Sequence, residues 1–157
     1  MYIHRIKNIQ ERDMSELYLI AFDGSAPSDR ALDYGVARAK AANAHILLAH
    51  VLEWSPYSFL SAEEIAERHK RRKEEVGRAE TVILEPIRKK LSAEGLQVAT
   101  EVRYGHVAEV LCDLATEVKA TQIIIGRTGE KGLQARLFGS VTATLSQVAP
   151  VPCTIVP

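Results

Sequence analysis

Short apolar runs recur along the chain, and longer stretches with a different spacing of apolar residues separate them. Residues 17–22, 45–52 and 121–125 are dominated by apolar side chains, without the regular polar alternation of a half-exposed strand. Strands that are buried on both faces of a parallel sheet show this continuous pattern. With the weaker runs at 96–102 and 153–156, the pattern predicts five strands.

The stretches between these runs have the spacing of amphipathic helices, with apolar residues three and four positions apart. Helices are predicted at about 28–42, 62–93, 107–119 and 140–148. Ser25 or Ser28 is suited to cap the first helix. Pro86 should bend or split the long, highly charged second helix, and Gly95 should end it.

Strand and helix therefore alternate from one end of the chain to the other. This order predicts an α/β fold: a single doubly wound, Rossmann-like, five-stranded parallel sheet with helices on both faces. Residues 16–157 form this domain, whereas residues 1–15 are a poorly patterned extension. A frayed tail is the favoured interpretation of the extension, and an arm that packs on a partner is the alternative.

Composition and charge argue against a nucleic-acid-binding, membrane-spanning or secreted protein. The chain has 157 residues and a formal net charge of zero, and a nucleic-acid-binding domain usually has a basic surplus. No apolar run has the length of a membrane span, and the N-terminal residues lack the apolar core of a secretory signal. Cys112 and Cys153 are far apart in the sequence, so reduced thiols are favoured over a disulfide and the expected compartment is the cytosol.

The candidate chemistry lies in a glycine-rich segment directly after the run 121–125. Gly126, Gly129 and the pair Gly139-Ser140 have the spacing G-x2-G-x9-G-S. The first two glycines follow a strand and the last pair opens a helix, whose free N–H groups suit a phosphate. Arg127 and Arg136 are nearby cations. The alternative is a loose loop with a glycine cap at each side, and the spacing is neither that of a P-loop nor that of the Rossmann fingerprint.

With these motifs the chain resembles the universal stress protein family over about residues 17–156, and within that family the glycine motif marks the ATP-binding branch. The other carriers of the resemblance are Asp23-Gly24-Ser25, His50-Val51 and Gly105-His106-x-Ala108-Glu109. Val107 departs from the proline of many relatives. The resemblance implies a homodimer joined through the last strand and a nucleotide in the crevice between the first and fourth strands.

The resemblance also implies a set of binding residues. Asp23 would face the ribose or adenosine side, and the backbone of Val51 would contact adenine. The residues implied around the nucleotide are Ala21, Phe22, Asp23, Val51, Gly126, Arg127, Gly129, Gly139, Ser140, Val141 and Thr142. The glycines would cradle the phosphates, and the last three residues would donate from the start of the helix. Phosphate-bound Mg²⁺ is compatible with this site, although no carboxylate cluster is built to hold it.

Three functions remain to be weighed. An ATP-binding stress-response or regulatory protein with little or no turnover is favoured, and a slow ATPase or phosphotransferase is the alternative. Catalysis needs a positioned base near the γ-phosphate, and Asp23, Glu130 and His106 are poor candidates for it, so no catalytic residue is assigned. The third function, an interaction module with a vestigial phosphate loop, conflicts with the intact glycine motif. The histidine spacings do not predict a metal site.

Overall fold

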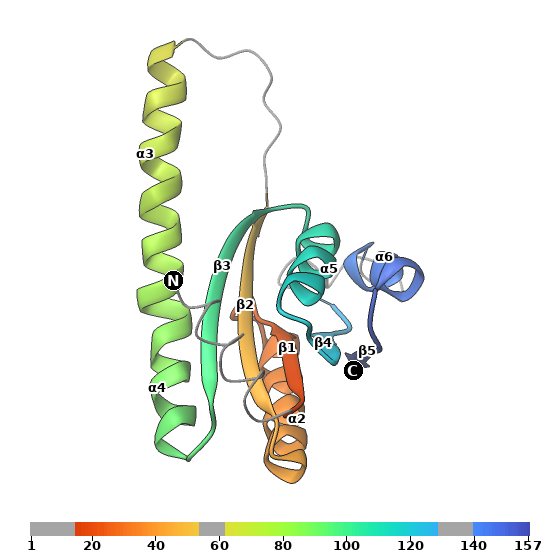
Figure 1. Ribbon diagram of the computed structural model, residues 1–157. Helices are drawn as coiled ribbons and strands as arrows, with labels where there is room; N and C mark the ends of the chain where they lie inside the picture. The colour runs from red at the N-terminus through yellow and green to blue at the C-terminus, as the bar shows by residue number, and fades with distance from the viewer. Residues whose placement is uncertain (1–14, 54–61, 129–139) are drawn as a thin grey trace.

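The computed structural model describes residues 15–53, 62–128 and 140–157. Their core is a five-stranded, all-parallel sheet with the strand order β3-β2-β1-β4-β5 (Figure 1). The strands are β1 (Leu17–Ala21), β2 (His45–Glu53), β3 (Val98–Gly105), β4 (Gln122–Gly126) and β5 (Cys153–Val156). The predicted doubly wound parallel sheet is confirmed.

Helices cover both faces of this sheet, as the sequence predicted. They are α2 (Ala26–Ala42), α3 (Ala62–Arg78), the π-helical η1 (Ala79–Leu84), α4 (Glu85–Ala93), α5 (Val107–Glu117) and α6 (Ser140–Val148). Buried residues of α2, η1 and α4 pack on one face of the sheet against Ile20, Leu48 and Ile124. Buried residues of α5 and α6 pack on the other face. Because alternate side chains of β1 point to opposite cores, no face of this strand is left for polar residues.

Helix α2 lies close to the sheet because Gly35 has no side chain. A Cβ atom built at Gly35 would lie 2.5 Å from Cδ1 of Ile20. The helix begins at Ala26, two residues before its predicted start, and Ser25 is its N-cap. The hydroxyl of Ser25 accepts a hydrogen bond from the N–H of Ser28 at 3.4 Å, which satisfies one of the free donors at the helix start.

The long charged helix is split, as Pro86 led us to predict, but the interruption precedes the proline. Helices α3, η1 and α4 follow one another as a single rod beside β3, and we call them the rod (Figure 1). At the end of η1 the N–H of Glu85 donates to the carbonyl of Glu80, five residues back. Pro86 has no N–H and its ring crowds the preceding turn, so the wider π-helical turn accommodates it within a continuing helix.

The rod ends at the predicted glycine. Gly95 has a φ of +89°, and the N–H of Leu96 donates to the carbonyl of Leu91 at 3.1 Å. These are features of a Schellman cap, in which the residue after the glycine closes the helix end. Leu96 therefore belongs to the cap, and β3 begins at Val98 and runs to Gly105 instead of covering the predicted 96–102.

A cluster of polar side chains joins the rod to the carboxyl end of β3. The hydroxyl of Tyr104 donates to the carboxylate of Glu75, and the guanidinium of Arg72 lies 5.4 Å from the centre of the Tyr104 ring. Partial burial, followed by the bond to Glu75, raises the pKa of Tyr104 to about 12. The rod is thus attached near the end of the sheet where ligands of doubly wound folds bind.

Two further findings bear on the environment of the protein. Across the described residues, no helix combines the length and the apolar character needed to cross a membrane. Cys112 and Cys153 are both free thiols, and burial raises the pKa of each above its usual value. Thiols with a raised pKa are less reactive than exposed ones, in line with the expectation of reduced cysteines.

Candidate functional site

The strand order reverses between β1 and β4, and this reversal creates the candidate site. The chain builds the sheet in one direction from β1 to β2 and β3, and then crosses to β4 on the other side of β1. β1 pairs in parallel with both neighbours, so the carboxyl ends of β1 and β4 lie side by side. Ligands of doubly wound sheets bind outside the strand ends at such a switch point.

The segments that follow these two strands are in contact. A Cβ atom built at Gly126 would lie 2.7 Å from the carbonyl oxygen and 2.8 Å from the carbonyl carbon of Pro27, in the first turn of α2. Only glycine allows this approach of two backbones. Gly126 does not have a positive φ, so glycine is required here by close packing against Pro27 and not by a left-handed backbone conformation. The contact brings the two sides of the crevice together.

Asp23 lies at the end of β1 and is tied to the start of α2. One oxygen of its carboxylate accepts hydrogen bonds from the N–H of Ser25, at 3.0 Å, and from the Ser25 hydroxyl. Gly24 between them has a φ of +79°, which bends the chain in a way that side chains disfavour. Asp23 is half-buried, and these bonds hold its carboxylate at the end of β1.

Ala21 and Phe22 support the site from behind. Both side chains are buried, on opposite faces of the sheet. The N–H of Phe22 donates to the carbonyl of Ala49 at 2.8 Å, and the carbonyl of Phe22 lies 2.7 Å from Nδ1 of His50. Since a carbonyl only accepts, Nδ1 of His50 carries the proton in this bond. The backbone N–H and C=O of Phe22 are thus both bonded within the protein, which leaves Phe22 only van der Waals contact with a ligand.

The backbone of Val51 points toward the crevice. In β2 the odd-numbered residues direct their N–H and C=O groups toward β1, as the bond from Phe22 to the carbonyl of Ala49 indicates, because these groups alternate in direction along a strand. β1 ends at Ala21, opposite Ala49. Val51 therefore presents a donor and an acceptor to the side on which β1 has ended.

The start of α6 is bonded to the end of β4. The hydroxyl of Thr142, a residue only 2% exposed, donates to the carbonyl of Arg127 at 3.5 Å. The N–H of Arg127 donates to the carbonyl of Val156 at 2.7 Å, and the side chain of Arg127 is exposed. Ser140 is exposed at the beginning of that turn, and Val141 packs against the core.

The structure thus brings together most of the residues predicted for the site. Gly129, Gly139 and Glu130 lie outside the described residues. His106 is the N-cap residue of α5, is exposed and makes no capping bond with its side chain. Within residues 15–53, 62–128 and 140–157 there is no group of His, Cys, Asp or Glu residues that could hold a metal ion.

Sequence reasoning missed two residues at the crevice. From the sequence, His50 is noted only as part of the His50-Val51 motif, and no role is assigned to Pro27. The signal for His50 is a polar residue in a buried position, since such a side chain needs a hydrogen-bond partner. For Pro27 no local signal exists, because its contact with Gly126 joins two distant parts of the chain.

The family model of the universal stress protein family matches residues 14–157. The chain belongs to the universal stress protein family. It is similar to the universal stress protein YxiE of Bacillus subtilis, with 31% identity over 151 residues that cover 88% of this chain and 96% of that protein. A universal stress protein of Methanocaldococcus jannaschii is 30% identical over 138 residues, which cover 88% of this chain and 79% of that protein.

Solved structures of other universal stress proteins share the fold. UspA from Lactobacillus plantarum superposes with a TM-score of 0.80 at 19% identity, covering 90% of this chain and 97% of that one. A family member from Arabidopsis thaliana with AMP bound has a TM-score of 0.59 at 19% identity, covering 90% of both chains. One from Archaeoglobus fulgidus in complex with dAMP has a TM-score of 0.56 at 19% identity, covering 91% of this chain and 98% of that chain.

Proposed function

We propose that this universal stress protein binds ATP in the crevice between β1 and β4 and acts as a cytosolic stress-response regulator with little or no turnover. The observation that carries the proposal is the contact between Gly126 and Pro27, which joins the segments that follow β4 and β1. Asp23 stands on one side of the crevice and the first turn of α6 on the other. Structural relatives with bound AMP and dAMP support an adenine nucleotide as the ligand.

Each part of the nucleotide has a candidate partner. The N–H and C=O of Val51 match the acceptor and the amine of adenine, and the carboxylate of Asp23 matches a ribose hydroxyl. The phosphates would lie at the amino end of α6, where Ser140 and the N–H groups of its first turn favour anions. Arg127 adds a nearby positive charge. Any Mg²⁺ would arrive bound to the phosphates, since the described residues offer it no carboxylate cluster.

Thermal unfolding with and without nucleotide tests the proposal. ATP at 100 times its dissociation constant should stabilise the fold by about 2.7 kcal/mol, which corresponds to a rise in Tm of roughly 5–11 °C for a chain of this size. AMP, cyclic AMP and GTP are compared under the same conditions. If no adenine nucleotide changes the Tm, the chain is an interaction module and the proposal fails.

Substitution of Asp23 locates the ligand. Asp23→Ala removes a charged acceptor worth about 1.5–3 kcal/mol, so the affinity for ATP should fall roughly 10- to 150-fold. Asp113→Ala is the matched control, because Asp113 is an exposed carboxylate on α5. Calorimetric titration measures both. Equal affinities in the two variants would place the nucleotide elsewhere.

Turnover is tested with a variant of the glycine motif. Gly129→Glu should abolish ATP binding by placing a negative side chain where the phosphates are expected, with the fold retained. Phosphate release by the wild type should then equal that of Gly129→Glu. Release well above this background would make the protein an ATPase or phosphotransferase instead of a regulator.

We also propose a homodimer joined through β5. This strand lies at the edge of the described sheet and pairs with β4. The N–H and C=O groups of Cys153 and Ile155 point away from β4, because those of the alternate residues make the bonds to it. Pairing with the same strand of a second copy would satisfy them. A monomeric mass in light scattering at micromolar concentration would refute the dimer.

A further inference from the structure

We propose that His50 is a positioning residue that ends the pairing of β1 with β2 and thereby keeps the N–H of Val51 available to the base of the nucleotide. The second half of this statement rests on the proposed function, whereas the first half concerns the protein without ligand. His50 is only 8% exposed and lies next to Val51 in β2, with its imidazole bonded to the carbonyl of Phe22, the residue that follows β1.

The register of the sheet shows which bond is missing. The pairs between β1 and β2 run from Leu17 with His45 to Ala21 with Ala49, and the N–H of Phe22 donates to the carbonyl of Ala49. In a parallel pair that continued by one step, the next bond would run from the N–H of Val51 to the carbonyl of Phe22. That bond is absent although both residues are described.

The imidazole of His50 takes the place of that missing donor. Its Nδ1 lies 2.7 Å from the carbonyl oxygen of Phe22, which is a normal length for a good N–H···O hydrogen bond. The carbonyl is satisfied from the side chain, so the chain after Phe22 no longer needs the backbone of β2. It can turn away toward Asp23 and Gly24, and the N–H of Val51 is left without a strand partner.

The arrangement has two consequences for the crevice. Val51 presents its N–H together with its C=O at the point where β1 ends, which is the donor and acceptor pair that adenine requires. The carbonyl of Phe22 is at the same time held next to Asp23, so one side chain sets the spacing between the adenine side and the ribose side. A donor kept unpaired in this way contributes to ligand binding because it is not already bonded in the free protein.

Amide hydrogen exchange in the absence of nucleotide tests the first half of the proposal. In the wild type, the amide of Val51 should exchange at least about tenfold faster than that of Ala49, whose N–H is in the ladder. In His50→Leu the Val51 N–H can bond the vacated carbonyl of Phe22, and its exchange should slow by about tenfold or more. His50→Asn, whose amide can donate to the same carbonyl, should restore the wild-type pattern.

Titration with ATP tests the second half on the same proteins. His50→Leu should bind ATP roughly three- to tenfold more weakly, the value of one hydrogen bond, and His50→Asn should recover most of the loss. His69→Leu is the control, because His69 is exposed on α3. Exchange and affinity are measured far below the Tm of both variants. A lower stability of His50→Leu than of His50→Asn then does not affect either measurement.

Two results would overturn the proposal. One is an exchange result: either the Val51 amide of the wild type exchanges as slowly as that of Ala49, or its exchange rate does not change in His50→Leu. The other is ATP affinity that is unaltered in His50→Leu while the exchange changes as expected. If the wild type bound no ATP at all, the proposed function would fail, and the exchange measurements would still decide whether His50 ends the ladder.

Discussion

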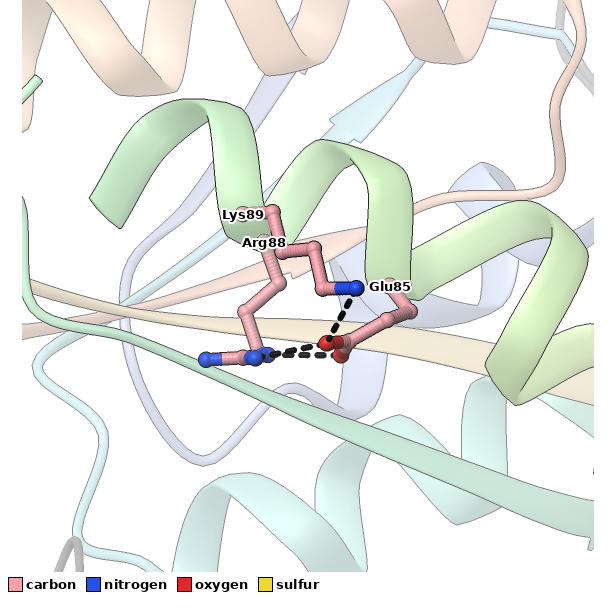
Figure 2. A network of polar contacts seen from close by, with 3 residues as sticks. All are labelled: Glu85, Arg88 and Lys89. Atoms are coloured by element: carbon pink, nitrogen blue, oxygen red, sulfur yellow. Dashed lines mark hydrogen bonds and ion pairs between the residues drawn. The ribbon is translucent and has the colours of Figure 1, made fainter. Parts of the chain in front are cut away.

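Polar side chains are used differently in two regions of the molecule. Around the ends of β1 and β4, the side chains of Asp23, Ser25, His50 and Thr142 bond mainly to backbone groups or to each other. On the rod, charged side chains bond to one another along the helix, as Figure 2 shows for Glu85, Arg88 and Lys89. The first arrangement holds the backbone in its conformation. The second lies on the surface of a helix that is already held by its own backbone hydrogen bonds.

The difference teaches where substitutions should matter. A bond from a buried side chain to a backbone group holds a conformation that no regular hydrogen-bond pattern would otherwise maintain. An exposed ion pair adds little because both partners are already well solvated. Substitutions around the crevice should therefore change the site as well as the stability, and matched substitutions on the rod should change neither by much.

The largest effect is expected for Gly126→Ala. The added Cβ would meet the backbone of Pro27 at 2.7 Å, and overpacking of this kind costs about 1–3 kcal/mol, or roughly 2–12 °C in Tm. ATP affinity should fall too, since the two sides of the crevice must separate. Gly77→Ala on α3 is the matched change, because its Cβ meets nothing within 4 Å; it should stabilise by up to about 1 kcal/mol. Scanning calorimetry measures the Tm of both variants. If both substitutions lowered the Tm, or both raised it, the expected difference between the crevice and the rod would be contradicted.

A smaller effect is expected for Ser25→Ala. The substitution removes the N-cap of α2 and one partner of the Asp23 carboxylate, with a cost of about 1 kcal/mol in stability. ATP should bind more weakly because Asp23 loses part of its orientation. Ser92→Ala on α4 is the rod counterpart, an exposed serine whose replacement should change stability by less than about 0.5 kcal/mol. Urea unfolding and ATP titration of the two variants measure the contrast.

The smallest effect is expected for Glu85→Gln. Arg88 holds the carboxylate of Glu85 through two bonds of 2.6 and 2.7 Å, and this contact lowers the pKa of Glu85. A partly exposed pair of this kind is worth about 0.2–1 kcal/mol, and ATP affinity should not change.

The pH dependence gives Glu85→Gln a sharper test. Because the pKa of Glu85 is lowered in the folded state, the wild type has its full excess in the free energy of unfolding over Glu85→Gln above the usual glutamate pKa of about 4.3. This excess should shrink as the pH falls through the lowered pKa. Urea unfolding of both proteins from neutral pH to about pH 3 measures this difference. An advantage that stayed constant or grew on acidification would contradict the assigned contact.

Much of the fold could be predicted from local pattern alone. The runs 17–22 and 45–52 became β1 and β2, and the spacing of apolar residues placed the helices between them. Errors occurred where one residue serves two elements. Leu96 was assigned to a strand, but it closes the helix cap at Gly95 and the strand begins at Val98. Its apolar side chain suits both roles, so the pattern could not separate them.

The candidate site was predicted less completely, for a physical reason. Asp23 and Val51 follow buried strands, so their place at the crevice follows from the fold and from the resemblance to the family. The need for glycine at Gly126 could not be predicted locally, because its backbone has no unusual φ and the close contact is with Pro27, which is distant in the sequence. The role of His50 could not be predicted from the sequence because its partner, the carbonyl of Phe22, is 28 residues away.

By itself, the sequence determined the order of strands and helices, an interruption of the rod close to Pro86 and the family, since hydrophobic spacing, proline geometry and glycine motifs are local properties. Only the tertiary structure decided that β1 stops pairing at Ala21, that His50 replaces the next bond of the ladder, and that Gly126 packs on Pro27. These features depend on the register between strands and on the approach of distant backbones. Both are set when the sheet closes around its two cores.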